Sequence, residues 1–306
     1  MITSPLTGIL PVAPTPFHDD GTVDQDGMRR VLDCIIDQGV DAICILANYS
    51  EQFVLSDEER ALLMRISLEH VAGRVPVIVT ISHFYTGIVV ERAKQAQALG
   101  ASMVMMMPPY HGVGLVPAEA GIYEHFQAVS DAIDIPIMVQ DAPLSGCQLS
   151  VPLLTRMAKE LEQVRYFKME MPFAADKLAA LIEAGGDAIE GPFDGEEAAT
   201  LLADLDAGCT GTMTSGLQCE HIGQIIRSYL AGDKEAALAH WTRCLPLINH
   251  ENRQCGLRAC KVVMKEGGVI GSDYVRHPLK PMSDRTRARL LQLAGDMDLI
   301  ALKWGK

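Results

Sequence analysis

Arg165-Tyr166-Phe167-Lys168-Met169-Glu170 is a short, mostly apolar run that predicts a buried strand, although Lys168 and Glu170 bring charges into it. Side chains alternate between the two faces of a strand, so Lys168 and Glu170 are expected on the same face. Apolar runs of the same kind recur along the chain: Ile9 to Phe17, Val40 to Ala47, Pro76 to His83, Ser102 to Pro109, Pro136 to Pro143, Asp187 to Phe193 and Cys209 to Ser215. Together with residues 165–170 they predict eight strands.

Amphipathic stretches lie between these runs. One example is Ser56 to Val71, which opens with Ser56-Asp57-Glu58-Glu59, a combination of N-cap residue and first-turn acids that is typical of a helix start. Strands that are apolar throughout belong to parallel sheets covered by helices. The order therefore predicts an α/β fold, a (β/α)8 TIM barrel over residues 1–224, with a C-terminal helical extension at 225–306.

Composition narrows the functional classes. The chain has 306 residues, 48% of them hydrophobic, and a formal charge of −13. This charge argues against nucleic acid and anionic membranes as partners, because both attract basic patches. No apolar stretch is long enough to span a bilayer, and Met1 to Phe17 lacks the basic start of a secretory signal. A cytoplasmic protein with a small-molecule substrate is predicted.

The cysteines form no pattern of spacing that suggests a metal site or a disulfide framework. Buried, reduced thiols are the expected state of all eight: Cys34, Cys44, Cys147, Cys209, Cys219, Cys244, Cys255 and Cys260. No metal ion is expected.

Lys168 is the first candidate for chemistry. Burying an ammonium group costs several kcal/mol unless it is paired, and a lysine desolvated in this way has a lowered pKa and can attack a carbonyl group to form an imine. A structural lysine in an ion pair with Glu170 is the alternative interpretation. The position of Lys168 on a strand of the predicted barrel, among strands that end in polar residues, favours catalysis.

In such a barrel the functional residues lie at the carboxyl ends of the strands. Several predicted strands end in polar groups there, in the segments Ala47-Asn48-Tyr49-Ser50-Glu51, Ser82-His83, Pro108-Pro109-Tyr110-His111, Gln140-Asp141-Ala142-Pro143, Phe193-Asp194-Gly195 and Thr212-Met213-Thr214-Ser215. We expect these side chains to form a ring around Lys168.

Four features of the sequence together resemble those of the dihydrodipicolinate synthase and N-acetylneuraminate lyase superfamily. They are Pro14-Thr15-Pro16-Phe17, Pro108-Pro109-Tyr110, Ala142-Pro143 and Lys168 on the predicted sixth strand. The resemblance covers nearly the whole chain. It implies a lysine-dependent (β/α)8 barrel, typically a homotetramer, that acts on a 2-oxo acid through a Schiff base and needs no separate cofactor. Lys168 would be the imine-forming residue.

The chain departs from the superfamily at positions that matter for the reaction. The loop with two threonines becomes Ala47-Asn48-Tyr49-Ser50-Glu51, the tyrosine pair after Pro-Pro becomes Tyr110-His111, and the strand-five tyrosine becomes Gln140. The tyrosine normally serves as the base for aldol cleavage, whereas an amide can only form hydrogen bonds. Dehydration instead needs a base for the C3 proton, and Glu170 shares the face of Lys168.

These residues suggest a dehydratase for a 2-oxo-3-deoxy sugar acid. Lys168 forms the imine, Glu170 takes the C3 proton, and Glu170 or His83 protonates the leaving hydroxyl. Tyr49 and Ser50 are expected to bind the substrate carboxylate. The synthases carry an arginine for a second carboxylate where this chain has Ser145, which favours a five-carbon sugar acid. The other predicted substrate contacts are Gln140, Asp141, Tyr110, His111, Asp194 and Thr214.

Two other functions fit the sequence: an aldolase acting on the same kind of sugar acid, and a sugar-acid-binding barrel without turnover. Single residues also have simpler interpretations. Asp194 is a candidate N-cap of the next helix, His83 and His111 are candidates for capping loops, and Met103 to Met107 is expected to be core.

Overall fold

The computed structural model of the protein describes residues 5–110 and 115–306, and eight strands lie within them. Their hydrogen-bonded order is β1-β8-β7-β6-β5-β4-β3-β2. The pairs from β3 to β8 are parallel, and each strand pairs with the next in the chain. This is the strand order of a (β/α)8 barrel, and it confirms the predicted fold class.

The chain forms two compact units, of which the first comprises the residues before Gly8 together with Pro76–Glu196 and Thr200–Met213. Its elements are β3 (Val77–Thr80), α3 (Thr86–Ala98), β4 (Met103–Met106), α4 (Glu119–Ser130), β5 (Ile137–Asp141), α5 (Val151–Glu160), β6 (Val164–Met169), α6 (Ala174–Gly185), β7 (Glu190–Asp194), α7 (Leu201–Asp206) and β8 (Gly211–Thr212). Short 3-10 turns lie at Pro143–Ser145 and Gly186–Ala188.

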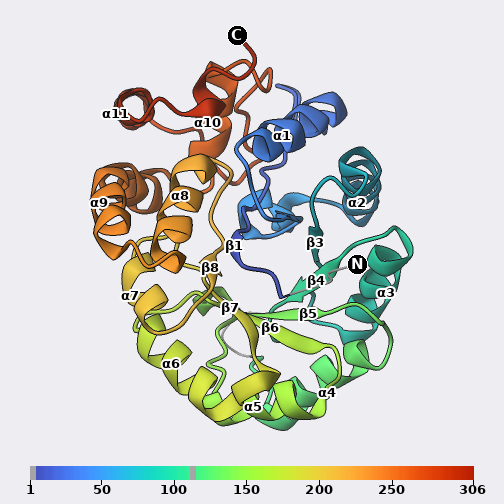
Figure 1. Cartoon of the computed structure of the whole chain (residues 1–306). Helices are drawn as coiled ribbons and strands as arrows, with labels where there is room; N and C mark the ends of the chain where they lie inside the picture. The colour runs from blue at the N-terminus through green and yellow to red at the C-terminus, as the bar shows by residue number, and fades with distance from the viewer. Residues whose placement is uncertain (1–4, 111–114) are drawn as a thin grey trace. The chain divides into compact units, whose positions relative to one another are not determined.

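The strands of the first unit form its core. Every residue of β3, β4 and β5 is buried, because α3 to α6 cover the outer face of the strands, as Figure 1 shows. The methionine run of β4 is fully buried, so its predicted role in the core is confirmed.

The second unit comprises Gly8–Val75, Glu197–Ala199 and Thr214–Lys306. Its elements are β1 (Gly8–Ile9), α1 (Gln25–Asp37), β2 (Ile43–Ile45), α2 (Asp57–Val71), α8 (Cys219–Leu230), α9 (Lys234–His250), α10 (Arg258–Glu266) and α11 (Asp284–Asp296), with 3-10 turns at Asn48–Ser50, Gln52–Val54 and Ile300–Leu302 and a π-helical turn at Glu251–Cys255. The segment after β1 bridges two others, because Val12 pairs with both Cys44 and Ser215.

The predicted helix start at Ser56 is confirmed. The Ser56 hydroxyl accepts a hydrogen bond from the backbone of Glu59, and the Glu59 carboxylate accepts one from the backbone of Ser56. This reciprocal capping satisfies two donors that the helix itself leaves unpaired. The helices predicted after residue 225 are also present, whereas the domain boundary at 224 stays a prediction.

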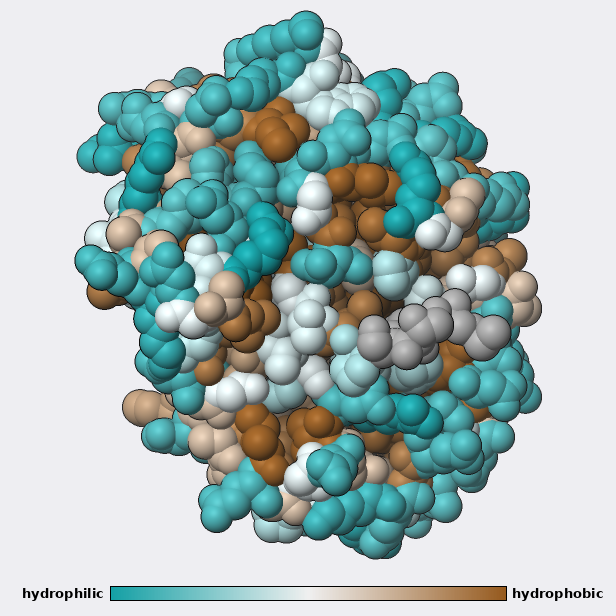
Figure 2. Space-filling view, in the orientation of Figure 1, coloured by the Kyte–Doolittle hydropathy of each residue, from teal (hydrophilic) through white to brown (hydrophobic). Residues whose placement is uncertain are grey.

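All eight cysteines are buried and free, as expected. Over the described residues, no helix is long and apolar enough to cross a membrane. The face of the molecule in Figure 2 is covered mostly by hydrophilic residues, with smaller hydrophobic patches between them.

Candidate active site

The register of three neighbouring strands decides which side chains share a face with Lys168. Gln140 of β5 lies opposite Lys168 of β6, and Phe193 of β7 lies on its other side. One residue further on, Met169 lies between Asp141 and Asp194. Paired residues of parallel strands point to the same face of the sheet. The side chain of Gln140 therefore lies on the same face as Lys168, whereas those of Asp141 and Asp194 lie on the face of Met169.

Lys168, Glu170 and Gln140 form a contiguous polar cluster. The Nζ of Lys168 forms an ion pair with Oε1 of Glu170, which confirms the expected shared face. The Lys168 side chain is 4% exposed and that of Glu170 is 19% exposed, so solvent reaches the carboxylate more than the amine. The Nε2 of Gln140 donates to the same Oε1 over 3.0 Å. The Oε1 of Gln140 is buried without a hydrogen-bond partner in the described structure.

Backbone hydrogen bonds hold this cluster in place. The N–H of Glu170 donates to the carbonyl of Asp141 over 2.9 Å, and the N–H of Gly195 donates to Met169 over 2.8 Å. A side chain at position 195 has no room: a Cβ there would lie 2.5 Å from Cγ of Glu170 and 3.0 Å from Cε of Lys168. Gly195 therefore lets the end of β7 pass directly against the lysine and the glutamate.

Asp141 is fully buried and bonds to the helix layer. Its Oδ2 lies 2.5 Å from Nζ of Lys177 on α6. Burial raises the pKa of Asp141, and the hydrogen bond from Lys177 opposes this shift. The prediction that Asp141 binds substrate stays a prediction, but this geometry favours a supporting role, because the carboxylate ties β5 to α6.

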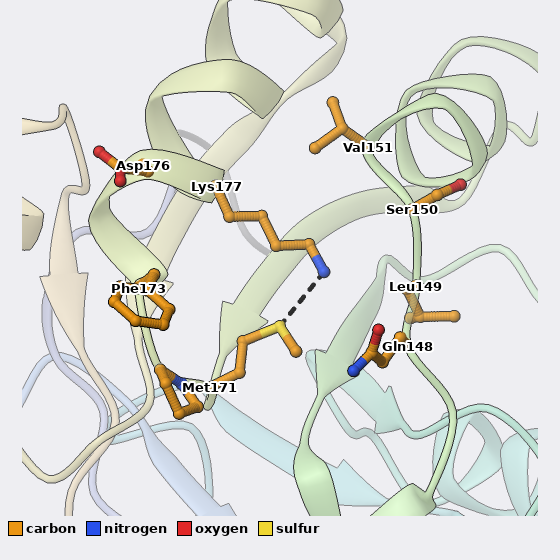
Figure 3. Close-up of a pocket in the computed structure, with 9 residues that line it drawn as sticks. Gln148, Leu149, Ser150, Val151, Met171, Phe173, Asp176 and Lys177 are labelled. Atoms are coloured by element: carbon orange, nitrogen blue, oxygen red, sulfur yellow. Dashed lines mark hydrogen bonds between the residues drawn. The ribbon is translucent and has the colours of Figure 1, made fainter.

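A pocket of about 580 Å³ opens beside Lys177. Figure 3 shows the lysine reaching from α6 toward Met171, whose sulfur lies 3.2 Å from Nζ. The remaining lining residues are Gln148, Leu149, Ser150, Val151, Pro172, Phe173 and Asp176. Lys168 is not among the residues that line this pocket.

Asp194 lies at the end of β7 and is fully buried. Its Oδ2 accepts a hydrogen bond of 2.5 Å from Thr212, and its Oδ1 accepts one of 2.9 Å from the backbone of Glu196. Burial and the charge of Asp194 raise the pKa of the neighbouring Asp204 to about 7. The interpretation of Asp194 as an N-cap is wrong, because α7 begins only at Leu201 and Thr200 precedes it. As with Asp141, direct contact with substrate stays a prediction, and the register favours a supporting role.

The remaining candidates of the first unit follow β3 and β4. His83 is half-buried, and its Nδ1 accepts a hydrogen bond of 3.0 Å from the backbone of Tyr85. That bond leaves Nε2 as the protonated nitrogen of a neutral ring. Tyr110 is half-buried, and His111 lies outside the described residues. The roles predicted for all three stay predictions.

The second unit holds the loop predicted to bind the carboxylate, residues 47–51. Tyr49 is half-buried within the turn Asn48–Ser50. Ser50 is buried, with its N–H donating to Ala47 and its hydroxyl donating to Ala13 over 2.7 Å. The N–H of Ser50 thus closes the turn, and its hydroxyl ties the loop to the segment after β1. Binding of the substrate carboxylate by Tyr49 and Ser50 stays a prediction.

The end of strand eight, in the second unit, carries Thr214 and Ser215. Both are buried, and the Thr214 hydroxyl donates to the carbonyl of Ser215 over 2.9 Å. The Ser215 hydroxyl donates to Glu251 over 2.5 Å, and its N–H donates to Glu197 over 2.6 Å. Burial raises the pKa of Glu251 to about 7. Substrate binding by Thr214 stays a prediction.

Several residues of these networks were not among the sequence predictions, including Gly195, Asp204, Lys177 and Glu251. A glycine directly after a strand end was a usable signal for Gly195. Lys177 and Glu251 each lie 36 residues along the chain from their partners, so no local pattern marks them.

A desolvated lysine paired with a glutamate on the sixth strand of a (β/α)8 fold defines a protein equipped for imine chemistry with carbonyl compounds. The comparisons with known proteins agree with this class. The chain belongs to the dihydrodipicolinate synthetase family, whose model matches residues 5–296.

The chain is also similar to individual members of this family. The chain is 56% identical to the L-2-keto-3-deoxyarabonate dehydratase of Azospirillum brasilense, over 97% of this chain and 96% of that protein. It is 28% identical to the 4-hydroxy-tetrahydrodipicolinate synthase of Acidobacterium capsulatum, over 94% of each chain. Among solved structures, a putative dihydrodipicolinate synthetase from Pseudomonas aeruginosa superimposes with a TM-score of 0.89 at 30% identity, covering 95% of this chain and 99% of the other.

Proposed function

We propose that this protein is a Schiff-base dehydratase that converts L-2-keto-3-deoxyarabonate into 2-oxoglutarate semialdehyde and water, as a step in L-arabinose metabolism. The observation that carries the proposal is the Lys168, Glu170 and Gln140 cluster, in which a carboxylate touches the amine and an amide stands at the strand-five position. The similarity to the Azospirillum dehydratase supports the choice of substrate.

The first step forms the imine. Glu170 takes a proton from the Lys168 ammonium group, to which it is already paired, and the neutral amine adds to C2 of the substrate. The C2 oxygen receives one proton from the amine nitrogen and one back from Glu170, and it leaves as water. The product is an iminium ion, which withdraws electrons from C3 and makes its protons acidic.

The second step removes the C4 hydroxyl. Glu170 takes a proton from C3, which gives the enamine, and the C4 hydroxyl then leaves as water with a proton from Glu170 or His83. The double bond that results between C3 and C4 is conjugated with the iminium. Transfer of a proton from C5 to C3 gives the enol of an aldehyde, and loss of the enol's hydroxyl proton with protonation of C4 gives the aldehyde. Hydrolysis by one water then frees Lys168 and the semialdehyde. Two waters are lost and one is regained, so one water is released overall.

The remaining predicted residues hold the substrate. The 47–51 loop, with Tyr49 and Ser50, binds the carboxylate, while Gln140 offers its buried, unpartnered Oε1 to a substrate hydroxyl. Such a hydroxyl would satisfy an acceptor whose burial is otherwise costly. Tyr110, His111 and Thr214 are proposed as further contacts, and Asp141 and Asp194 as residues that support β5 and β7. The enzyme acts as a cytoplasmic homotetramer without a separate cofactor.

Product analysis tests the proposal. Incubation with L-2-keto-3-deoxyarabonate is expected to give one five-carbon product that is lighter than the substrate by one water. An aldolase would release pyruvate and a two-carbon aldehyde, and a binding barrel would leave the substrate unchanged. Either result contradicts the proposal. The 3-deoxy acid derived from D-xylonate, tested in parallel, measures stereochemical selectivity.

One variant tests the role of Glu170 in the cluster, and a second serves as its control. Borohydride is expected to reduce the pyruvate imine and to label Lys168 in the wild type and, more slowly, in Glu170→Gln, where water takes over the proton transfers of imine formation. Dehydration by Glu170→Gln falls by about 10²-fold or more. Dehydration by Glu170→Gln at near the wild-type rate would assign the proton transfer to another group. Lys159→Met is the control for specific labelling, because Lys159 is an exposed lysine on α5 that lies outside the cluster. It should retain labelling at Lys168.

A further inference from the structure

A second buried lysine lies in the C-terminal helical region. Lys261 of α10 is fully buried, and its Nζ forms an ion pair with Glu51, at the end of the 47–51 loop. The same Nζ lies 3.3 Å from the carbonyl of Thr15 and 4.6 Å from the centre of the Phe17 ring. Lys261 thus joins the 47–51 loop to the Pro14–Phe17 segment.

Thr15 continues this connection to Ser50. The Thr15 hydroxyl donates to the carbonyl of Ser50 over 2.7 Å, and the Ser50 hydroxyl donates to Ala13 over 2.7 Å. Lys261 therefore reaches the loop by two routes, through Glu51 directly and through Thr15 to the backbone of Ser50. All of these groups are buried.

Glu51 itself has a backbone conformation that needs support. Its φ is 59°, in the left-handed region, where a residue with a Cβ is strained. Its side chain is fully buried, and its Oε2 has no hydrogen-bond partner in the described structure. Burial raises the pKa of Glu51 and lowers that of Lys261, while the attraction between the two opposes both shifts. The ion pair with Lys261, with a smaller contribution from Arg276, therefore stabilises this carboxylate and with it the turn.

We infer that Lys261 is a positioning residue for the substrate carboxylate, acting through Glu51 and Thr15 on the 47–51 loop. The inference rests on the proposed function, in which this loop binds the carboxylate of a 2-oxo acid. It gives the C-terminal helical region a part in substrate affinity, because α10 supplies the residue that fixes the shape of the loop. Lys261 touches neither the substrate nor the reacting atoms.

The experiment measures the half-saturating pyruvate concentration for borohydride trapping, with KM and kcat for dehydration alongside. Lys261→Met removes the charge and the donor, and it is expected to raise the half-saturating concentration and KM by about tenfold, the effect of losing one charged hydrogen bond, with a smaller change in kcat. Lys265→Met is the matched control. Lys265 lies one turn further along α10, in a more exposed ion pair with Asp273, and its loss should leave these values unchanged.

The double variant Lys261→Met with Glu51→Gln separates positioning from stability. It removes both buried charges, so we expect its thermal stability to recover toward the wild type, while half-saturation stays raised because methionine cannot donate to Thr15. Wild-type half-saturation in the folded double variant would overturn the inference. If Lys261→Met does not fold, the double variant alone decides. If the wild type traps pyruvate and neither variant raises the half-saturating pyruvate concentration, only this inference is overturned. If the wild type traps no pyruvate, the proposed function is overturned together with it.

Discussion

Gln140 is the residue through which the neighbouring strand acts on the Lys168 and Glu170 pair. Its amide donates to the oxygen of Glu170 that also binds the lysine, so it helps to orient the proposed base. A hydrogen bond to a charged group contributes about 1.5–3 kcal/mol, which corresponds to a rate factor of roughly 10 to 100. We expect Gln140→Leu to lower kcat by about tenfold or more, while borohydride still traps pyruvate on Lys168. Steady-state kinetics and labelling measure the two effects.

Gln148→Leu is the control for this substitution. Gln148 is an exposed glutamine that lines the pocket beside Lys177, so the same change there should leave kcat unaltered. A Gln140→Leu enzyme with the kcat of the wild type would show that Glu170 needs no orientation by the amide.

Some of the cluster follows from the sequence and some does not. The alternation of a strand predicts that Lys168 and Glu170 share a face, because they are two residues apart. Which residues of the neighbouring strands join them depends on register. The pairing of β5 with β6 shifts at Ile137 and Met138, and no local pattern encodes such a shift. The observed register pairs Asp141 with Met169, and the role of Asp141 in substrate binding stays a prediction.

The connection between β7 and α7 is an element whose stability should depend on pH. Asp204 has a pKa raised to about 7 by burial, by Asp194 and, less strongly, by Glu196. The folded state then holds a proton that the unfolded state, with its ordinary pKa of 3.8, releases. Stability contributed by this proton is present at low pH and is lost as pH rises through about 7.

Asp204→Asn should remove this dependence, because an amide does not titrate. Relative to the wild type, the variant should gain thermal stability as pH rises between the unfolded pKa of 3.8 and the folded value of about 7. Thermal unfolding of both proteins across that pH range tests whether the Tm of the variant rises relative to that of the wild type. A difference in Tm between variant and wild type that does not change with pH would mean that Asp204 is ionised in the folded protein.

Elements with strong local signals were predicted well, and this connection was not. The start of α2 follows from Ser56 and Glu59, whose capping contacts need only the helix itself. After β7, an acid followed by a glycine suggested another helix start. The chain instead takes left-handed conformations at Glu197 and Ala198 and begins α7 at Leu201. Trp241 of α9 donates to the carbonyl of Ala198 over 3.0 Å, a long-range contact that local patterns cannot reveal.

At the scale of the whole molecule, the C-terminal helices share a compact unit with the first part of the chain. Gly8–Val75 and Thr214–Lys306 belong to the same unit. Besides the Lys261 and Glu51 pair, Arg276 forms an ion pair with Glu59, and Arg30 donates to the carbonyl of Val269 over 2.7 Å. Residues 225–306 are therefore expected to be part of the fold rather than an appendage added to a complete barrel.

A chain that ends at residue 224 tests this expectation. Removal of α10 leaves the carboxylate of Glu51 buried without its lysine, and loss of one partner of a buried ion pair costs about 3–5 kcal/mol. The cut also divides α8 (Cys219–Leu230), and loss of the apolar surface that its second half and α9 to α11 bury adds to this cost. The sum is comparable with the whole stability of a typical domain, about 5–15 kcal/mol. We expect the shortened chain to show no cooperative thermal transition and no trapping of pyruvate. A cooperative transition would instead identify residues 1–224 as a domain that folds alone. Addition of 225–306 as a separate chain should restore trapping if the helices act only by completing the shared core.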